Sequence, residues 1–142
     1  MNPEPSTQAP SRTASRRHVV VFADDDPRTL LALERTLRYE PYEILLTTDP
    51  GKALEWIRSR PVSVVVSDYR MPEMCGMTLL ELAQTHSPRT ARILLTGFPG
   101  EEPVRRARDA GFLTLTAKPW NGRELMRMIR ERIRARELLD GP

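Results

Sequence analysis

Short apolar runs that alternate with amphipathic stretches constrain the fold of this chain more than any other feature. The alternation repeats five times from residue 18 onward, and the runs are of strand length and rich in aliphatic residues. The predicted strands are His18–Ala23, Tyr42–Thr47, Val62–Ser67, Ala91–Thr96 and Thr114–Ala117. Because strands that alternate with helices form parallel sheets, the sequence predicts an α/β fold.

The stretches between these runs carry the start and stop signals of helices. An Asp-Pro pair, which suits the N-cap and the first helical residue, stands at Asp26-Pro27 and again at Asp49-Pro50. Further helices are predicted from about Met77 to Thr85, from near Pro103 to Gly111, and after an N-cap at Asn121. Each predicted strand is therefore followed by a helix.

Five strand-helix units predict a doubly wound five-stranded parallel sheet, in the order 2-1-3-4-5, with helices on both faces. Right-handed crossovers between neighbouring parallel strands place the helices on those faces. In such sheets functional groups gather beyond the carboxyl ends of the strands, near the point where the strand order reverses. We therefore look for the functional site at those ends.

A chain of 142 residues suits one compact domain. We place this domain at residues 18–139. Residues 1–17 hold three prolines and several Ser and Thr residues without apolar periodicity, which predicts a disordered N-terminal leader. Residues 140–142 are interpreted as a short C-terminal tail.

The cysteine content and the hydropathy of the sequence indicate the cellular compartment. The single Cys75 cannot form an internal disulfide, and we find no stretch apolar enough to span a bilayer. We therefore expect a cytoplasmic protein with no membrane contact. The 22 basic and 19 acidic residues give a net charge of +3, which is too small to imply nucleic-acid binding by itself.

Polar residues with a shared chemical use stand at the ends of four predicted strands. They are Asp24, Asp25 and Asp26 after the first strand, Asp68 after the third, Thr96 at the end of the fourth and Lys118 after the fifth. Clustered carboxylates repel one another and need cations nearby. Hard oxygen ligands without a His or thiol pattern favour Mg²⁺, and the Lys118 ammonium supplies further positive charge.

This constellation suits phosphoryl transfer, in which the protein aligns a nucleophile and neutralises charge on the phosphoryl oxygens. Asp68 is the natural nucleophile, because carboxylates form aspartyl-phosphate intermediates. Any one of these residues alone would be ordinary: an Asp at a strand end is most often a turn or N-cap residue, which is our interpretation of Asp26. Their joint placement at successive strand ends is what indicates a site.

Four segments resemble the response regulator receiver family, and the resemblance covers about residues 18–139. They are Val19–Pro27 with its three aspartates, Ser67–Gly76, Leu95-Thr96-Gly97 and Lys118-Pro119-Trp120. The resemblance implies a phosphoacceptor at Asp68, with Thr96 and Lys118 contacting the phosphoryl group. It also implies that Mg²⁺ is held by Asp24, Asp25, Asp68 and the backbone carbonyl of Arg70, and that the bond before Pro119 is cis.

The resemblance further implies a signalling role in a two-component phosphorelay. A histidine kinase or phosphotransfer protein would supply the phosphoryl group. A downstream protein or a second copy of the chain would dock on the face made by the fourth helix, the fifth strand and the fifth helix. Such a chain is not an enzyme beyond its own phosphorylation and slow dephosphorylation, and we expect no output domain within it.

Two positions depart from the family pattern. Leu115 stands three residues before Lys118, where the family usually has a Tyr or Phe that rotates on activation. Cys75 stands where a polar residue often precedes Gly76, and we expect Gly76 to supply freedom in the sign of φ.

Two other functions compete with this one. A haloacid-dehalogenase-type phosphatase or phosphotransferase also uses an Asp nucleophile with Mg²⁺, but it expects a second Asp where Arg70 stands. A DNA-binding function would rest on the arginines of the last two helices, yet glutamates are interleaved with them and no helix-turn-helix segment fits after residue 139. We therefore expect protein partners and no direct nucleic-acid binding.

Overall fold

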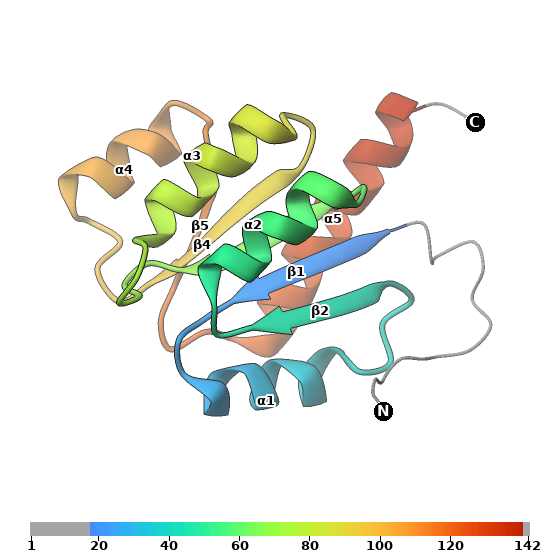
Figure 1. Cartoon of the computed structure of the whole chain (residues 1–142), viewed down its shortest axis with the longest axis horizontal. Coiled ribbons are helices and arrows are strands. Elements are labelled where there is room, and N and C mark those ends of the chain that lie inside the picture. The colour runs from blue at the N-terminus through green and yellow to red at the C-terminus, as the bar shows by residue number, and fades with distance from the viewer. Residues whose placement is uncertain (1–17, 141–142) are drawn as a thin grey trace.

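The computed structural model describes residues 18–140 and confirms the predicted parallel sheet (Figure 1). All strand pairs are parallel and the order is β2-β1-β3-β4-β5. The strands are β1 (Val19–Ala23), β2 (Glu43–Thr47), β3 (Val64–Asp68), β4 (Ala91–Thr96) and β5 (Thr114–Ala117). The predicted leader, residues 1–17, and residues 141–142 lie outside the described residues.

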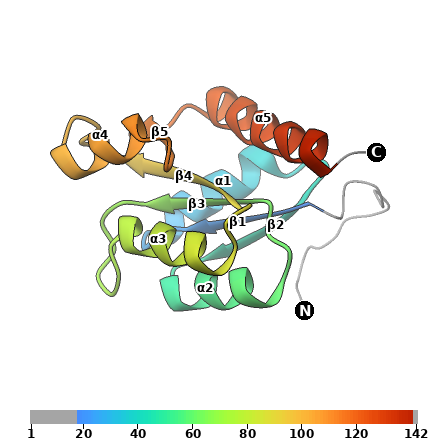
Figure 2. The ribbon, with the colours of Figure 1, turned by 90° about the horizontal axis from the view of Figure 1, so that it is seen from above.

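A helix follows each strand, as the sequence predicts. The helices are α1 (Pro27–Leu37), α2 (Pro50–Ser59), α3 (Gly76–His86), α4 (Glu102–Asp109) and α5 (Gly122–Asp140). Seen from above, α1 and α5 cover one face of the sheet and α2 and α3 the other, while α4 lies at the β5 end (Figure 2). The sheet is therefore covered on both faces, which accounts for the near-continuous apolar sequence of its central strands.

Alternate residues of each central strand feed two separate cores. In β1, Val20 and Phe22 pack with the buried side chains of α1 and α5, whereas Val19 and Val21 pack with those of α2 and α3. This alternation follows from the two-residue period of a strand. Buried apolar contacts thus hold the helices to both faces of the sheet. The polar residues at the carboxyl ends of the strands are not part of either apolar core.

Strand and helix bounds differ slightly from the predicted ones at functional positions. The β3 ladder begins at Val64 rather than Val62, because the Val62 N–H donates to the nearby Arg60 carbonyl at 2.9 Å. It includes Asp68, because the Tyr69 N–H still donates to Leu95 of β4 at 3.0 Å. Asp68 is therefore held by the sheet itself rather than by the loop that follows.

Candidate phosphoacceptor and metal site

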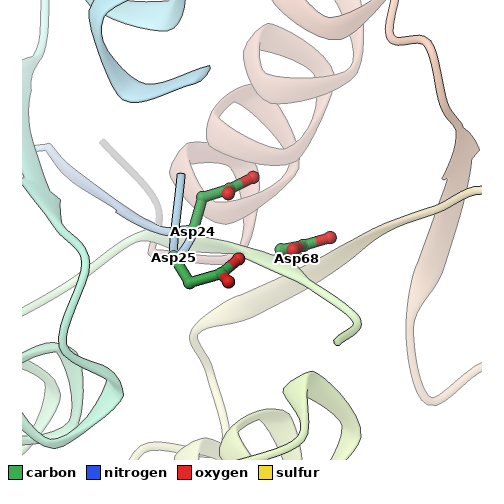
Figure 3. Close-up of side chains that lie close together, drawn as sticks. All are labelled: Asp24, Asp25 and Asp68. Atoms are coloured by element: carbon green, nitrogen blue, oxygen red, sulfur yellow. The ribbon is translucent and has the colours of Figure 1, made fainter. Parts of the chain in front are cut away.

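Three aspartates meet at the carboxyl ends of β1 and β3 (Figure 3). One carboxylate oxygen from each of Asp24, Asp25 and Asp68 lies within 4.8 Å of the others. Asp24 and Asp68 are buried and Asp25 is exposed, so the cluster opens toward solvent on the Asp25 side. The structure thus brings together the three carboxylates that the sequence places at these strand ends.

Asp24 is the carboxylate whose environment is least satisfied. Its Oδ1 accepts the Asp26 N–H at 2.9 Å, but among residues 18–140 its buried Oδ2 has no hydrogen-bond partner. Burial raises the pKa of Asp24 to about 6, and the neighbouring Asp68 carboxylate adds to the rise, while the Asp26 N–H and Lys118 oppose it. A buried oxygen of this kind suits a cation that binds more closely than Lys118, whose Nζ lies 3.7 Å away, beyond hydrogen-bond distance.

Asp68 is held in one orientation by two donors. Its Oδ1 lies 2.8 Å from Lys118 Nζ and accepts the Tyr69 N–H at 2.9 Å. Partial burial works to lower the pKa of Lys118, but the carboxylates of Asp68 and Asp24 outweigh burial and hold this pKa above its ordinary value. Lys118 therefore stays charged and bridges the ends of β3 and β5, 3.7 Å from Asp24 Oδ2.

Thr96 completes the side of the site at the end of β4. It is buried, its Oγ1 accepts the Phe98 N–H at 3.0 Å, and its carbonyl accepts the Lys118 N–H at 2.8 Å. An open pocket lies between these strand ends and is lined by Asp68, Tyr69, Arg70, Thr96, Gly97, Phe98 and Lys118. The predicted nucleophile, hydroxyl and lysine therefore share one pocket.

Gly76 is required at this site for a different reason from the one that the sequence suggests. Within the described chain the glycine with positive φ is Gly111, at +79°, so the expected freedom in the sign of φ is not what Gly76 supplies. A Cβ on Gly76 would lie 2.1 Å from the carbonyl oxygen of Asp68, and the Gly76 N–H donates to Tyr69 at 2.7 Å. Close backbone approach is the physical reason for this glycine.

The remaining predicted positions fall as expected. Asp26 is the N-cap of α1, and its side chain accepts the Arg28 N–H at 2.9 Å. The bond between Lys118 and Pro119 is cis. Leu115 is half-buried against the core on the α2 and α3 side. The Arg70 side chain points toward Glu101, at 2.9 Å, and so lies away from the carboxylate cluster; the predicted role of its backbone carbonyl at a metal stays a prediction.

The donor set fits a hard divalent cation. The clustered side-chain atoms are all carboxylate oxygens, and one of them, Asp24 Oδ2, is buried without a protein donor among the described residues. Mg²⁺ takes oxygen ligands and typically binds through one or two carboxylates while keeping several waters. Asp24, Asp25 and Asp68, with the Arg70 carbonyl that the resemblance adds, are the residues that could hold it.

Sequence reasoning missed the side chains that surround the mouth of this pocket. Tyr69 and Phe98 line it together with Arg70, whose guanidinium pairs with Glu101. Proximity to the strand ends is the one signal that could have pointed to Tyr69 and Phe98. The pairing with Glu101 joins positions 31 residues apart and leaves no trace in local sequence pattern.

Comparison with known proteins gives a consistent result. The family described as "Response regulator receiver domain" matches residues 20–130. The chain is 29% identical over 126 residues to the hydrogenase transcriptional regulatory protein HoxA of Cupriavidus necator, covering 88% of this chain and 26% of HoxA. It is 32% identical over 124 residues to the transcriptional regulatory protein PdtaR of Mycobacterium tuberculosis, covering 86% of this chain and 58% of PdtaR.

Solved structures show the same fold. The signal receiver domain of an HD domain-containing protein from Pseudomonas fluorescens Pf-5 superposes with a TM-score of 0.78 at 32% identity, covering 85% of this chain and 98% of that one. A CheY-like response regulator receiver domain protein from Methanospirillum hungatei JF-1 gives 0.78 at 27% identity, covering 87% and 98%. The match thus spans whole receiver domains but only part of the curated regulators.

Membrane insertion finds no support in the helices. Within residues 18–140, none combines the length and the apolar character that crossing a bilayer requires.

Proposed function

The chain belongs to the response regulator receiver family, and on that premise we propose that it accepts a phosphoryl group on Asp68 and signals by changing its surface. The observation that carries this proposal is the position of Asp68, which is buried at the end of β3, held by Lys118 at 2.8 Å and flanked by Asp24 and Asp25. A structural aspartate would not need two further carboxylates against it, because their repulsion costs stability.

The proposed step is a displacement at phosphorus. A carboxylate oxygen of Asp68 forms the new P–O bond, and the bond from phosphorus to the donor breaks, with its electron pair leaving on the imidazole nitrogen of a phosphohistidine. Lys118 neutralises charge on the phosphoryl oxygens, and Thr96 is placed in the same pocket to hydrogen-bond one of them. The Thr96 O–H is available for this bond, because Oγ1 acts only as the acceptor of the Phe98 N–H.

The proposed cofactor is Mg²⁺, held by Asp24, Asp25, Asp68 and the Arg70 carbonyl. When bound, it neutralises the carboxylates and the transferring phosphoryl group. The chain's own part is to present Asp24 Oδ2, the buried oxygen that lacks a donor among the described residues.

Labelling tests the acceptor. With Mg²⁺ and acetyl phosphate, the full chain should gain one base-labile phosphoryl group, located at Asp68 by mass spectrometry. Asp68→Asn should abolish the label, whereas Asp26→Asn should retain it, because Asp26 is the N-cap of α1 and is not one of the three clustered carboxylates. A label on Ser67, or undiminished labelling of Asp68→Asn, would overturn the assignment.

A melting experiment tests the metal. Mg²⁺ should raise the Tm of the unmodified chain by mass action, since it binds the folded site and not the unfolded chain. Replacing Asp24 and Asp25 with Ala should remove both this Tm response and the labelling. A double variant that labels at the normal rate would contradict the metal site.

We propose that the chain acts in the cytoplasm and receives its phosphoryl group from a histidine kinase or phosphotransfer protein. We also propose that it is not a turnover enzyme. A receiver consumes its donor once per site, whereas a dehalogenase-type phosphatase would turn over many equivalents. Arg70, at the position where that class needs a second acid, favours the receiver. Steady release of phosphate at many equivalents per chain would favour the phosphatase.

The proposed output surface is the face made by α4, β5 and α5, which would dock a downstream protein or a second copy of the chain rather than nucleic acid. Much of its basic charge is neutralised within the chain, because Arg105 and Arg106 pair with Glu102 and Arg127 pairs with Glu131. Amide shifts on adding beryllofluoride and Mg²⁺ should cluster at residues 96–118 and along α5. Shifts confined to α1 and α2 would show the surface to be wrong.

A further inference from the structure

Two loops beside the acceptor pocket are joined by one ion pair. Arg70, in the loop after β3, places its Nη2 2.9 Å from Oε2 of Glu101, in the loop after β4. The Arg70 guanidinium also lies 5.1 Å from the ring centroid of Tyr69 and 5.4 Å from that of Phe98. We call these four residues, Tyr69, Arg70, Phe98 and Glu101, the loop clamp.

Glu101 connects the loop clamp to α4, because it is the N-cap residue of that helix. Its side chain does not cap the described helix and is directed to Arg70 instead. Its other oxygen, Oε1, is buried and has no hydrogen-bond partner among residues 18–140. Glu101 is therefore held by Arg70 in a position that leaves one of its oxygens unsatisfied, which makes release of the side chain inexpensive.

The rest of α4 is weakly anchored. In its described residues Glu102–Asp109, the one buried side chain is Val104, and Ala107 is partly buried against the same core. Arg105 and Arg106 pair with Glu102 of the same helix, so these two ion pairs do not connect α4 to another element. The loop clamp is thus a large share of what fixes the N-terminal end of α4.

The loop clamp also borders Asp68, where the negative charge of a phosphoryl group would appear. Tyr69, Arg70 and Phe98 line the same pocket as Asp68. An aspartyl phosphate carries about 1.5 to 2 negative charges. Because the charge of the Asp68 carboxylate is lost in forming it, the site gains up to about one charge, now spread over phosphoryl oxygens that attract arginine. Lys118 already lies 2.8 Å from Asp68 and keeps its place at the acceptor when the phosphoryl group is added. Arg70 is a second cation lining this pocket, and its partner Glu101 lies outside the acceptor cluster and can be exchanged.

We propose that the Arg70–Glu101 ion pair is a latch that holds the start of α4 to the phosphoacceptor loop, and that a phosphoryl group on Asp68 opens it by competing with Glu101 for the Arg70 guanidinium. The opening half of this proposal rests on the proposed function. The latch links the site to α4 by charge, in a chain whose β5 carries Leu115 at the position of the usual aromatic switch. A group shifts such an equilibrium only through its different affinity for the two states, which Arg70 supplies.

Beryllofluoride with Mg²⁺, as a stand-in for the phosphoryl group, tests the opening half by titration of the full chain followed by NMR. Glu101→Gln should tighten apparent beryllofluoride binding about three-fold, because the competitor for Arg70 is weakened. Arg70→Gln should not tighten binding, since the guanidinium itself is gone. The double variant should match Arg70→Gln. Glu102→Gln is the control: it removes a neighbouring acid that pairs with Arg105 and Arg106, and it should leave the affinity unchanged.

Amide exchange in the ligand-free chain tests the holding half. Arg70→Gln and Glu101→Gln should both speed exchange at residues 101–105 by several-fold, and to similar extents. Unchanged exchange in both variants would overturn the latch, whatever the chain's ability to take a phosphoryl group. Equal tightening by Glu101→Gln and Glu102→Gln, or tightening by Glu101→Gln in the Arg70→Gln background, would overturn opening by competition. A chain that labels at Asp68 with none of these effects would retain its proposed function and lose the latch.

Discussion

The two ends of the central strands treat polar residues in opposite ways. At the amino end, the buried His18 places Nδ1 2.8 Å from Ser63 Oγ and Nε2 2.8 Å from the Glu137 carboxylate of α5. Nearby, the Val62 carbonyl accepts from Thr90 Oγ1 at 2.7 Å and from Arg136 at 3.1 Å. At the carboxyl end, three carboxylates crowd together, and Asp24 Oδ2 finds no donor within the described chain.

The difference shows which end is built for stability and which for chemistry. Satisfied buried hydrogen bonds stabilise the fold, whereas an unsatisfied carboxylate destabilises it until a cation or proton arrives. Substitutions at the two ends should therefore change the free energy of unfolding in opposite directions, apart from positions where the carboxyl end depends on packing or capping. The four predictions that follow run from the largest expected effect to the smallest.

Gly76→Ala should be the most damaging single change at the carboxyl end. Because the new Cβ would lie 2.1 Å from the Asp68 carbonyl oxygen, the loop must shift, and we expect a loss of about 3 kcal/mol in unfolding free energy. Urea denaturation measures this loss. Gly97→Ala, at the same end, is the matched control: no atom lies within 4 Å of its added Cβ, so the steric cost should be absent. Equal losses in the two variants would contradict the packing argument.

His18→Ala should weaken the amino end without touching the chemistry. It leaves Ser63 buried without its partner, so we expect a loss of about 2 to 3 kcal/mol in urea denaturation. Labelling at Asp68 should be unchanged under conditions where the variant is folded. Glu137→Gln keeps an acceptor for His18 on a half-exposed side chain and should lose less than about 1 kcal/mol. A larger loss for Glu137→Gln than for His18→Ala would contradict this prediction, because it would show that the Glu137 carboxylate stabilises the fold more than the buried His18–Ser63 hydrogen bond does.

Asp24→Asn should stabilise the metal-free chain. The pKa of Asp24 is raised from 3.8 to about 6 in the folded state, so the folded chain holds a proton that the unfolded chain releases. The stability linked to this proton is fully present below about pH 4 and is lost as pH rises through about 6. At pH 7.5 the variant should therefore gain about 2 kcal/mol, a little less than the full shift implies because an interaction with Lys118 is also lost.

Denaturation of the metal-free wild type and Asp24→Asn across pH 4 to 7.5 measures this difference. The wild type should lose stability over that range relative to the variant, and Mg²⁺ should restore it only in the wild type. A variant that is less stable than the wild type at pH 7.5 would show that Asp24 is a structural residue.

Asp26→Ala should have the smallest effect, in the opposite direction from Asp24→Asn two residues away. Asp26 caps α1, and its bonds to Arg28 lower the pKa of its carboxyl. Loss of an N-cap removes about 1 kcal/mol of unfolding free energy. The Mg²⁺ response of the Tm should remain. If Asp26→Ala abolished that response, the metal site would extend to the third acid.

Much of the fold was predictable because its causes are local. The strand runs and the Asp-Pro caps at Asp26 and Asp49 are confirmed within a few residues. The β3 bounds differ from the predicted ones because of individual hydrogen bonds: the Val62 N–H donates locally to Arg60, and the Tyr69 N–H that follows Asp68 donates to Leu95 of β4. The site was predictable to the level of which residues meet, because Asp24, Asp68, Thr96 and Lys118 end neighbouring parallel strands.

The sequence by itself determined the order of elements and the edge at which the polar residues gather, since periods of two and 3.6 residues decide which side chains face a core. Only the tertiary structure decided the pairings across the chain: Arg70 with Glu101, His18 with Glu137, and Gly76 against the Asp68 carbonyl. These contacts depend on distances and rotamers that arise when remote segments pack. No local pattern records them, because each partner alone is compatible with an ordinary exposed loop or helix end.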